Sequence, residues 1–314
     1  MNLLVAIVGP TGVGKSRLAL FLAQKFSGEI VNADSRQVYR HMNIGTAKPG
    51  REELSRVPHH LIDIIDPDAD FSLAQYKQLA CRAIEDIQQR GKLPLLVGGS
   101  GLYLWTIIEG WQVPEVPPDP ELRHYLEKKA ATTGTAALYQ ELLQADPESA
   151  EKIDPRNIRR VIRALEVITK TRKPFSQLRL KSPPPYQTFI IGLTANRATL
   201  YHNINERVDK MLAQGFVAEV ENLRQMRYDV KLPTLFSIGY RQIGAFLKGT
   251  LTLAGATGQI KTETHRLARH QYAWFRHRDT RINWFDITKD TDADIERALA
   301  GFLKAQQVPE KGRA

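Results

Sequence analysis

An apolar run that leads directly into a glycine-rich loop constrains the fold of this chain more than any other stretch. Residues 2–8 have the length of a buried strand, and Gly9-Pro-Thr-Gly-Val-Gly-Lys-Ser16 follows at once. Residues 17–25 then predict a helix. Strand, glycine loop and helix in this order are typical of a phosphate-binding loop (P-loop). We therefore expect an α/β fold with a P-loop core, in which a mostly parallel sheet is flanked by helices.

The residue types of this loop indicate the chemistry that it supports. Glycines let backbone N–H groups turn towards an anion, and the N-terminus of the following helix adds aligned dipoles. Lys15 supplies a charge for terminal phosphates, and Ser16 supplies a hydroxyl for Mg²⁺. The loop thus predicts a bound polyphosphate, which could be a nucleotide such as ATP or another diphosphate.

Composition narrows the class of protein. The 314 residues carry a formal net charge of +10, which favours a polyanionic partner. Cys81 is the only cysteine, so the chain cannot form an internal disulfide or a zinc site built mainly from cysteines. No apolar stretch approaches the roughly 20 residues that span a bilayer. We expect a cytoplasmic enzyme that does not contact membranes.

Further strands place acidic side chains near the loop. The strand predicted over residues 29–34 ends in Asp34, and functional groups gather at the carboxyl ends of parallel strands. The alternative for Asp34 is a helix N-cap. Residues 59–66 contain another predicted strand, and Asp63 or Asp66 could help to hold Mg²⁺ or could simply form a turn. Residues 93–97 predict a buried strand before a Gly-Gly-Ser-Gly turn.

Two proline-rich segments divide the chain. Residues 113–120 and 181–186 are rich in proline and flank predicted helices at 121–132, 135–143 and 157–169. This arrangement predicts an inserted all-helical domain at 118–185 within a core made of 1–117 and 186–314. Strand character returns at 188–193 and at 283–286, with helices predicted between and after them.

Two segments combine positive charge with features that suit RNA. Residues 156–181 are rich in lysine and arginine, and residues 261–281 interleave basic residues with Tyr272, Trp274 and Phe275. Cations contact phosphates, and aromatic or guanidinium planes stack on exposed bases. Together they favour a nucleic acid as the polyanionic partner.

Seven motifs in order resemble those of the tRNA dimethylallyltransferases, also called tRNA isopentenyltransferases. They are the loop at 9–16, Ala33-Asp-Ser-Arg-Gln-Val-Tyr39, Ile44-Gly-Thr-Ala-Lys-Pro49, Gly98-Gly-Ser-Gly-Leu-Tyr103, Arg159-Arg-Val-Ile-Arg-Ala-Leu-Glu166, Ile238-Gly-Tyr-Arg-Gln242 and Tyr272-Ala-Trp-Phe-Arg276. The second and third are more specific than the P-loop, which many families share. Ser100 and Gly12 stand where the family more often has threonine and alanine. The absence of a C-terminal zinc finger is typical of a bacterial-type member.

The resemblance implies an activity and its partners. A dimethylallyl group would pass from dimethylallyl diphosphate to the exocyclic amine (N6) of the adenine 3′ to the anticodon in tRNA, with release of diphosphate. Mg²⁺ would be the cofactor, and the helical insertion would contact the tRNA anticodon stem-loop. We expect a monomer. Flipping the target base out of its stack should cost a few kcal/mol.

The resemblance also implies roles for single residues. Asp34 would act as general base on the adenine amine, with Thr11, Lys15 and Arg207 also at the reacting centre. The diphosphate would contact Gly9, Pro10, Thr11, Gly12, Val13, Gly14, Lys15 and Ser16, and Ser16 would ligate the metal. The tRNA would contact Asp34, Ser35, Arg36, Gln37, Ser100, Arg123, Arg159, Arg160, Val161, Ile162 and Arg163.

Three other functions share these features. A phosphotransferase or NTPase would use Lys15 and Ser16 on ATP or GTP. A prenyltransferase acting on free adenine nucleotides would need the same loop, but it would not need a basic helical insertion. An RNA-binding protein could use the loop only as a regulatory switch, without chemistry on the base.

Overall fold

A single parallel sheet organises the larger part of the chain. The computed structural model describes residues 2–178, 181–182, 186–228 and 232–307. Within these ranges, six strands pair in the order β3-β2-β4-β1-β5-β6, and every pair is parallel. The predicted α/β fold is confirmed. The strands are β1 (Leu3–Val8), β2 (Gly28–Asn32), β3 (His59–His60), β4 (Leu93–Val97), β5 (Gln187–Thr194) and β6 (Ile282–Asp286).

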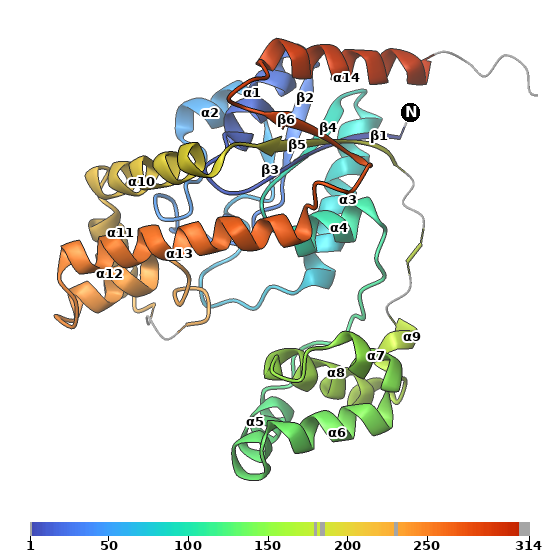
Figure 1. Cartoon of the computed structure of the whole chain (residues 1–314), viewed down its shortest axis with the longest axis vertical. Helices are drawn as coiled ribbons and strands as arrows, with labels where there is room; N and C mark the ends of the chain where they lie inside the picture. Colours follow the sequence, from blue (N-terminus) through green and yellow to red (C-terminus); the bar gives the residue numbers. More distant parts are fainter. Residues whose placement is uncertain (1, 179–180, 183–185, 229–231, 308–314) are drawn as a thin grey trace, which may run out of the picture. The chain divides into compact units, whose positions relative to one another are not determined.

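The central strands are buried because helices cover both faces of the sheet. β1 and β4 are apolar along their whole length and β5 is apolar over residues 189–193, as strands covered on both faces must be. Leu18 and Leu22 of α1 (Lys15–Lys25) and Leu299 of α14 (Asp292–Gln307) pack in one cluster with these strands. Figure 1 shows α1 and α14 on one side of the sheet and α3 (Leu73–Gln89) and α4 (Gly101–Ile108) on the other.

A second apolar cluster joins the later helices to the loop after β2. Val38, Tyr39 and Met42 pack against side chains from four helices. This cluster anchors residues 38–42 on a helical base, which fixes the position of the segment that follows Asp34. The helices are α10 (Arg197–Ala213), α11 (Phe216–Gln225), α12 (Tyr240–Leu247) and α13 (Leu253–Trp274).

The chain forms a second compact unit made mainly of helices. Ser72–Tyr76 and Glu109–Pro184 form this unit, and the rest of the chain forms the other. Asp119, Asp146 and Asn157 cap three of its helices, each accepting the backbone N–H of the third residue of the helix. Pro183–Pro185 of the second proline-rich segment lie outside the described residues. The helices are α5 (Pro120–Thr133), α6 (Thr135–Ala145), α7 (Pro147–Lys152), α8 (Ile158–Thr171) and α9 (Phe175–Leu178).

The strand predicted within residues 59–66 is much shorter than expected. Only His59 and His60 pair in the sheet, because Leu61 (φ 64°) and Asp63 (φ 55°) take the left-handed conformation and end the extended backbone. The short helix α2 (Arg51–Arg56) precedes this edge strand. None of the helices in the described ranges is long and apolar enough to cross a membrane.

Candidate active site

The loops after neighbouring strands enclose one large cavity. Because the strands run parallel, the loops that follow β1, β2 and β4 leave the same edge of the sheet. The cavity has a volume of about 1160 Å³, and all of its walls belong to the α/β unit. Residues 11–16 line it together with Asp34, Gln37, Arg207 and Gln271. Gly9 and Pro10 connect β1 to this wall.

The glycine loop has the geometry of an anion site. Gly12 (φ 82°) and Gly14 (φ 91°) adopt the left-handed conformation that other residues rarely take. α1 begins directly after this turn and has no side-chain N-cap, so its first N–H groups face the loop. The Lys15 ammonium donates to the carbonyl of Pro10 over 2.8 Å. The predicted phosphate-binding loop therefore has the shape that a diphosphate would need.

Two cations beside the loop are poorly solvated. Burial lowers the pKa of Lys15 to about 7 from its ordinary value of 10.5, and the charge of Arg207 acts in the same direction. Burial also lowers the pKa of Arg207, while the Asp34 carboxylate opposes the change in both residues. Two neighbouring cations removed from water would be stabilised by an anion between them. The electrostatics thus favour an anionic ligand at this wall.

A buried asparagine holds Asp34 in place. Asn32, at the end of β2, accepts the backbone N–H of Asp34 over 2.9 Å and donates to the carbonyls of Asp34 and Leu61. Asp34 in turn accepts the backbone N–H of Arg36 over 2.8 Å through Oδ1. The Asp34 residue also lines the cavity. The structure therefore brings Asp34, Lys15 and Arg207 together, as predicted, and gives Asp34 a turn-forming bond rather than a helix cap.

The loop after β4 packs against the loop after β2. Ser100 accepts the backbone N–H of Ser35 over 3.0 Å, and its own N–H donates to the carbonyl of Ala33. Gln37 donates its amide to the carbonyls of Thr46 and Ala47, both at 3.1 Å. Of the predicted tRNA contacts, Ser35 and Ser100 thus bond to each other and Arg36 bonds to Asp34, while Gln37 bonds to the segment at 46–47.

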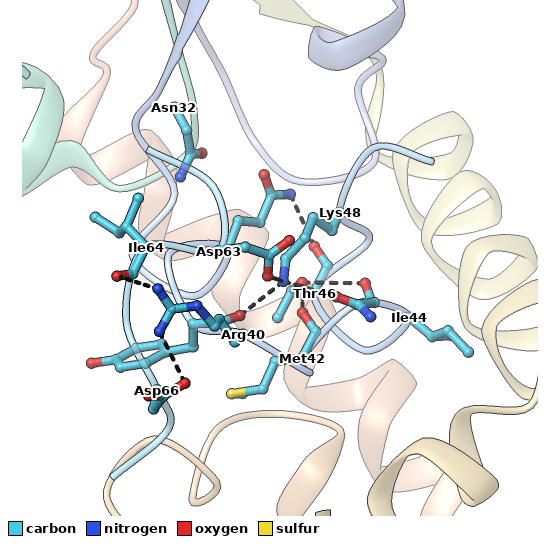
Figure 2. A network of polar contacts seen from close by, with 12 residues as sticks. Asn32, Arg40, Met42, Ile44, Thr46, Lys48, Asp63, Ile64 and Asp66 are labelled. Carbon is cyan, nitrogen blue, oxygen red and sulfur yellow. Dashed lines mark hydrogen bonds and ion pairs between the residues drawn. The ribbon is translucent and has the colours of Figure 1, made fainter. Parts of the chain in front are cut away.

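A buried lysine without a predicted role holds this wall of the cavity. The Lys48 side chain is 3% exposed and donates to the carbonyl of Tyr39, to Asn43 and to Asp63, at 2.8, 2.9 and 2.5 Å. Figure 2 shows its ammonium between the loops that follow β2 and β3, with Arg40 bound to Ile64 and Asp66 beside it. Lys48 belongs to the motif at 44–49, and this motif is the sequence feature that could have indicated its role.

Carboxylates that could hold a metal are largely paired with cations. Asp63 binds Lys48 and Asp66 binds Arg40, so neither carboxylate is available without breaking an ion pair. Among the described residues, no group of three or more histidine, cysteine or acidic side chains is arranged to hold a metal ion. Ser16 lines the cavity at the start of α1. A Mg²⁺ ion carried by phosphate oxygens needs only one or two protein ligands, and this donor set fits such an ion.

The predicted tRNA contacts on α8 of the helical unit include both buried apolar side chains and exposed arginines. Val161 and Ile162 are buried in its apolar core, so these two predictions are wrong for the side chains. Arg159 and Arg160 are exposed, and neither forms an ion pair with a described residue. Arg159 and Arg160 are therefore the members of the segment whose side chains are placed to meet a ligand.

Arg123 and Arg163 instead bind a buried carboxylate. Glu166 is fully buried and accepts both guanidinium groups at 2.5 to 2.9 Å, together with the backbone N–H of Asp119 at 2.7 Å. Burial alone would raise the pKa of Glu166, but the bonds from Arg123, Asp119 and Arg163 outweigh it and lower the pKa. These two arginines thus have a structural role in joining α5 to α8.

The exchange Glu166→Gln is expected to destabilise the protein by about 1–3 kcal/mol, because two guanidinium groups lose a charged acceptor. The pKa of Glu166 is lowered in the folded protein, so its carboxylate stabilises the fold at neutral pH. This stabilisation is lost as the pH falls below the ordinary pKa of a glutamate. Urea unfolding at pH 7 and at acidic pH measures both effects. Glu127→Gln, an exposed change on α5, is the control. Equal stabilities of the two variants at pH 7 would contradict this role.

The fold and the cavity define an α/β protein with an anion-binding loop beside a carboxylate. The model of a family described as IPP transferase matches residues 37–278. Similar relatives include the tRNA dimethylallyltransferases of Roseiflexus sp., 53% identical over 87% of this chain and 90% of the relative, and of Dehalococcoides mccartyi, 47% identical over 96% and 92%. This chain belongs to the IPP transferase family.

Solved structures agree with this assignment. The tRNA isopentenylpyrophosphate transferase of Bacillus halodurans is 40% identical, with a TM-score of 0.72 over 97% of this chain and 98% of that one. A eukaryotic dimethylallyltransferase acting on tRNA is 29% identical, with a TM-score of 0.83 over 100% and 82%. The family suggested by the seven motifs is confirmed.

Proposed function

We propose that this enzyme transfers a dimethylallyl group from dimethylallyl diphosphate to N6 of the adenine 3′ to the anticodon in tRNA. The observation that carries the proposal is one cavity that holds both an anion-binding loop and a carboxylate, Asp34. The names of the relatives supply the dimethylallyl group and the tRNA, and the adenine N6 follows from the family resemblance. Because the enzyme acts on tRNA, we propose that it works in the cytoplasm. We also propose that it is a monomer.

The residues of the cavity divide the chemistry between them. The allylic C–O bond breaks, and diphosphate leaves with the bonding electrons. Lys15, Arg207 and the N–H groups of the loop stabilise the charge that grows on the leaving oxygens. The adenine amine forms the new C–N bond, and Asp34 accepts the proton that the amine loses. Thr11, which lines the cavity, would contact the diphosphate or the incoming amine.

Magnesium would bind at the same wall of the cavity. Ser16 and the diphosphate oxygens would hold the ion, with water completing its shell. When bound, Mg²⁺ would supply positive charge that neutralises the diphosphate as a leaving group. The residues of the chain would still orient the amine and accept its proton.

Recognition of the tRNA would involve both compact units. Ser35, Arg36, Gln37 and Ser100 belong to the loops beside Asp34, where a flipped-out adenine would enter. Arg159 and Arg160 on the helical unit would contact phosphates of the anticodon stem-loop. The formal net charge of +10 would draw the polyanion to the protein.

The exchange Arg160→Ala is expected to weaken tRNA binding and to reduce the slope of log affinity against log salt by about one, because one phosphate contact is lost. Binding titrations between low and moderate salt measure this slope. Arg297→Ala, which removes an exposed arginine from α14, is the control for the loss of one charge. A slope equal to that of the control would mean that Arg160 faces solvent and contacts no phosphate.

A transfer assay tests the proposed function directly. The protein is mixed with Mg²⁺ and dimethylallyl diphosphate labelled in the prenyl group, together with unmodified tRNA or with AMP. Label on a tRNA adenine beside the anticodon supports the proposal. Label only on AMP would indicate a prenyltransferase of free nucleotides, and ATP hydrolysis without transfer would indicate a nucleotide site. Tight RNA binding without chemistry would indicate a regulatory loop.

A further inference from the structure

Gln271 bridges two loops that line the cavity. Its side chain projects from α13 and is 8% exposed. Oε1 accepts the backbone N–H of Thr11 over 2.8 Å, and Nε2 donates to the carbonyl of Gly99 over 2.9 Å. One carboxamide therefore joins the phosphate-binding loop after β1 to the loop after β4.

The bridge continues to the carboxylate at the other side of the cavity. Ser100 follows Gly99 and bonds to Ser35 and to the carbonyl of Ala33, on either side of Asp34. A connected set of hydrogen bonds thus runs from the P-loop to the turn that carries Asp34. Beyond Gln271, this set consists of backbone groups and the short side chain of Ser100. It therefore contains few bonds that can rotate.

Only glutamine satisfies both ends of this bridge. Thr11 offers a donor and Gly99 an acceptor, so the group between them must accept at one atom and donate at the other. A glutamate could not donate to Gly99, and an asparagine is one methylene shorter. A Cβ atom on Gly99 would lie 2.2 Å from Nε2 and 3.9 Å from the Lys15 ammonium, so the absence of a side chain allows the close approach.

We propose that Gln271 is a positioning residue, which sets the separation between the diphosphate site and Asp34. This inference rests on the proposed function, in which the allylic carbon must meet the adenine amine. A misplacement of about 1 Å can slow a reaction by about 10²-fold. Both polar ends of the Gln271 side chain are bonded to the two loops, so its effect is expected to pass through them.

Loss of the bridge should also let water compete with the amine. The allylic C–O bond breaks as before, a water oxygen forms the new C–O bond, and the proton of that water passes to solvent. The products are dimethylallyl alcohol and diphosphate instead of modified tRNA. The ratio of alcohol to modified tRNA therefore reports the position of the amine, and a simple loss of folded protein would not change it.

The test compares Gln271→Met, which keeps the length of the side chain, with Gln259→Met, an exposed change on the same helix. Label from dimethylallyl diphosphate is followed into tRNA and into alcohol in single-turnover reactions. We expect Gln271→Met to slow transfer by about 10²-fold and to raise the share of alcohol, with binding of both substrates retained. The control should behave as the wild type. An unchanged ratio of alcohol to modified tRNA in Gln271→Met would overturn the inference.

Gly99→Ala tests the same bridge from its other end. The new methyl group meets only the tip of a flexible side chain, so the fold should tolerate it while the Gln271 amide moves away. We expect the same rise in the share of alcohol, and no further rise when Gly99→Ala is combined with Gln271→Met. An unchanged share in Gly99→Ala overturns the inference, even if Gln271→Met fails to fold. A wild-type protein that labels no tRNA overturns the proposed function and the inference together.

Discussion

Asp34→Asn is expected to slow prenyl transfer by about 10²–10⁴-fold, which is the usual contribution of a general base. The exchange keeps the shape of the side chain and keeps Oδ1, which accepts the N–H of Arg36 over 2.8 Å. It removes the basic oxygen that would take the proton of the adenine amine. Single-turnover transfer and separate binding titrations with tRNA and dimethylallyl diphosphate measure the effect, and both ligands should still bind.

Asp34→Ala distinguishes this role from that of a turn former. Alanine removes both the base and the bond to Arg36, whereas asparagine removes only the base. A general base predicts that both variants lose most of their turnover. If asparagine restored most of the activity that alanine loses, then Asp34 would act by holding the turn, and the base would have to be sought elsewhere in the cavity.

Much of the fold and of the P-loop wall follows from local sequence. The apolar runs at β1, β4 and β5 predict buried strands, and the positive φ angles of Gly12 and Gly14 match the spacing of glycines in the loop. Asp34 could be placed at the same edge because parallel strands end together. Each of these inferences needs only the residues within one or two neighbouring elements.

The sequence does not reveal partners that come from distant parts of the chain. The family resemblance implies that Arg123 and Arg163 contact tRNA, and nothing local in the sequence shows that both pair with the buried Glu166. Gln271 bonds to Thr11, which is 260 residues away. The sequence does contain one indication that Gln271 is buried. Ala268 and Phe275 lie at helical spacing before and after Gln271, and both are buried. A glutamine on the apolar face of a helix needs a polar partner, but only the fold identifies that partner.

The Lys15 side chain should make diphosphate binding dependent on pH. Burial and the Arg207 charge lower its pKa to about 7 in the empty site, and a bound diphosphate would raise it again. Below pH 7 the free protein already holds this proton. Above pH 7 the proton must be taken up on binding, so affinity should fall by up to about tenfold for each further pH unit. The terminal phosphate of dimethylallyl diphosphate titrates near pH 6, below this window.

Calorimetric titration of dimethylallyl diphosphate at pH 8, in two buffers with different ionisation enthalpies, counts the protons taken up. The wild type should take up close to one proton. Lys15→Arg keeps a charge that does not titrate in this range, so it should bind with no uptake. Lys15→Met should bind weakly and slow transfer by about 10²–10³-fold, the usual cost of losing a donor to the developing charge.

Lys210→Met is the matched control, because Lys210 also lines the cavity but is largely exposed on α10. It should keep the proton uptake of the wild type, since the proton is assigned to Lys15 alone. Uptake that persisted in Lys15→Arg would assign the titrating group to another residue. In that case Lys15 would already be charged in the empty site, and the pH dependence of diphosphate affinity would come from that other residue.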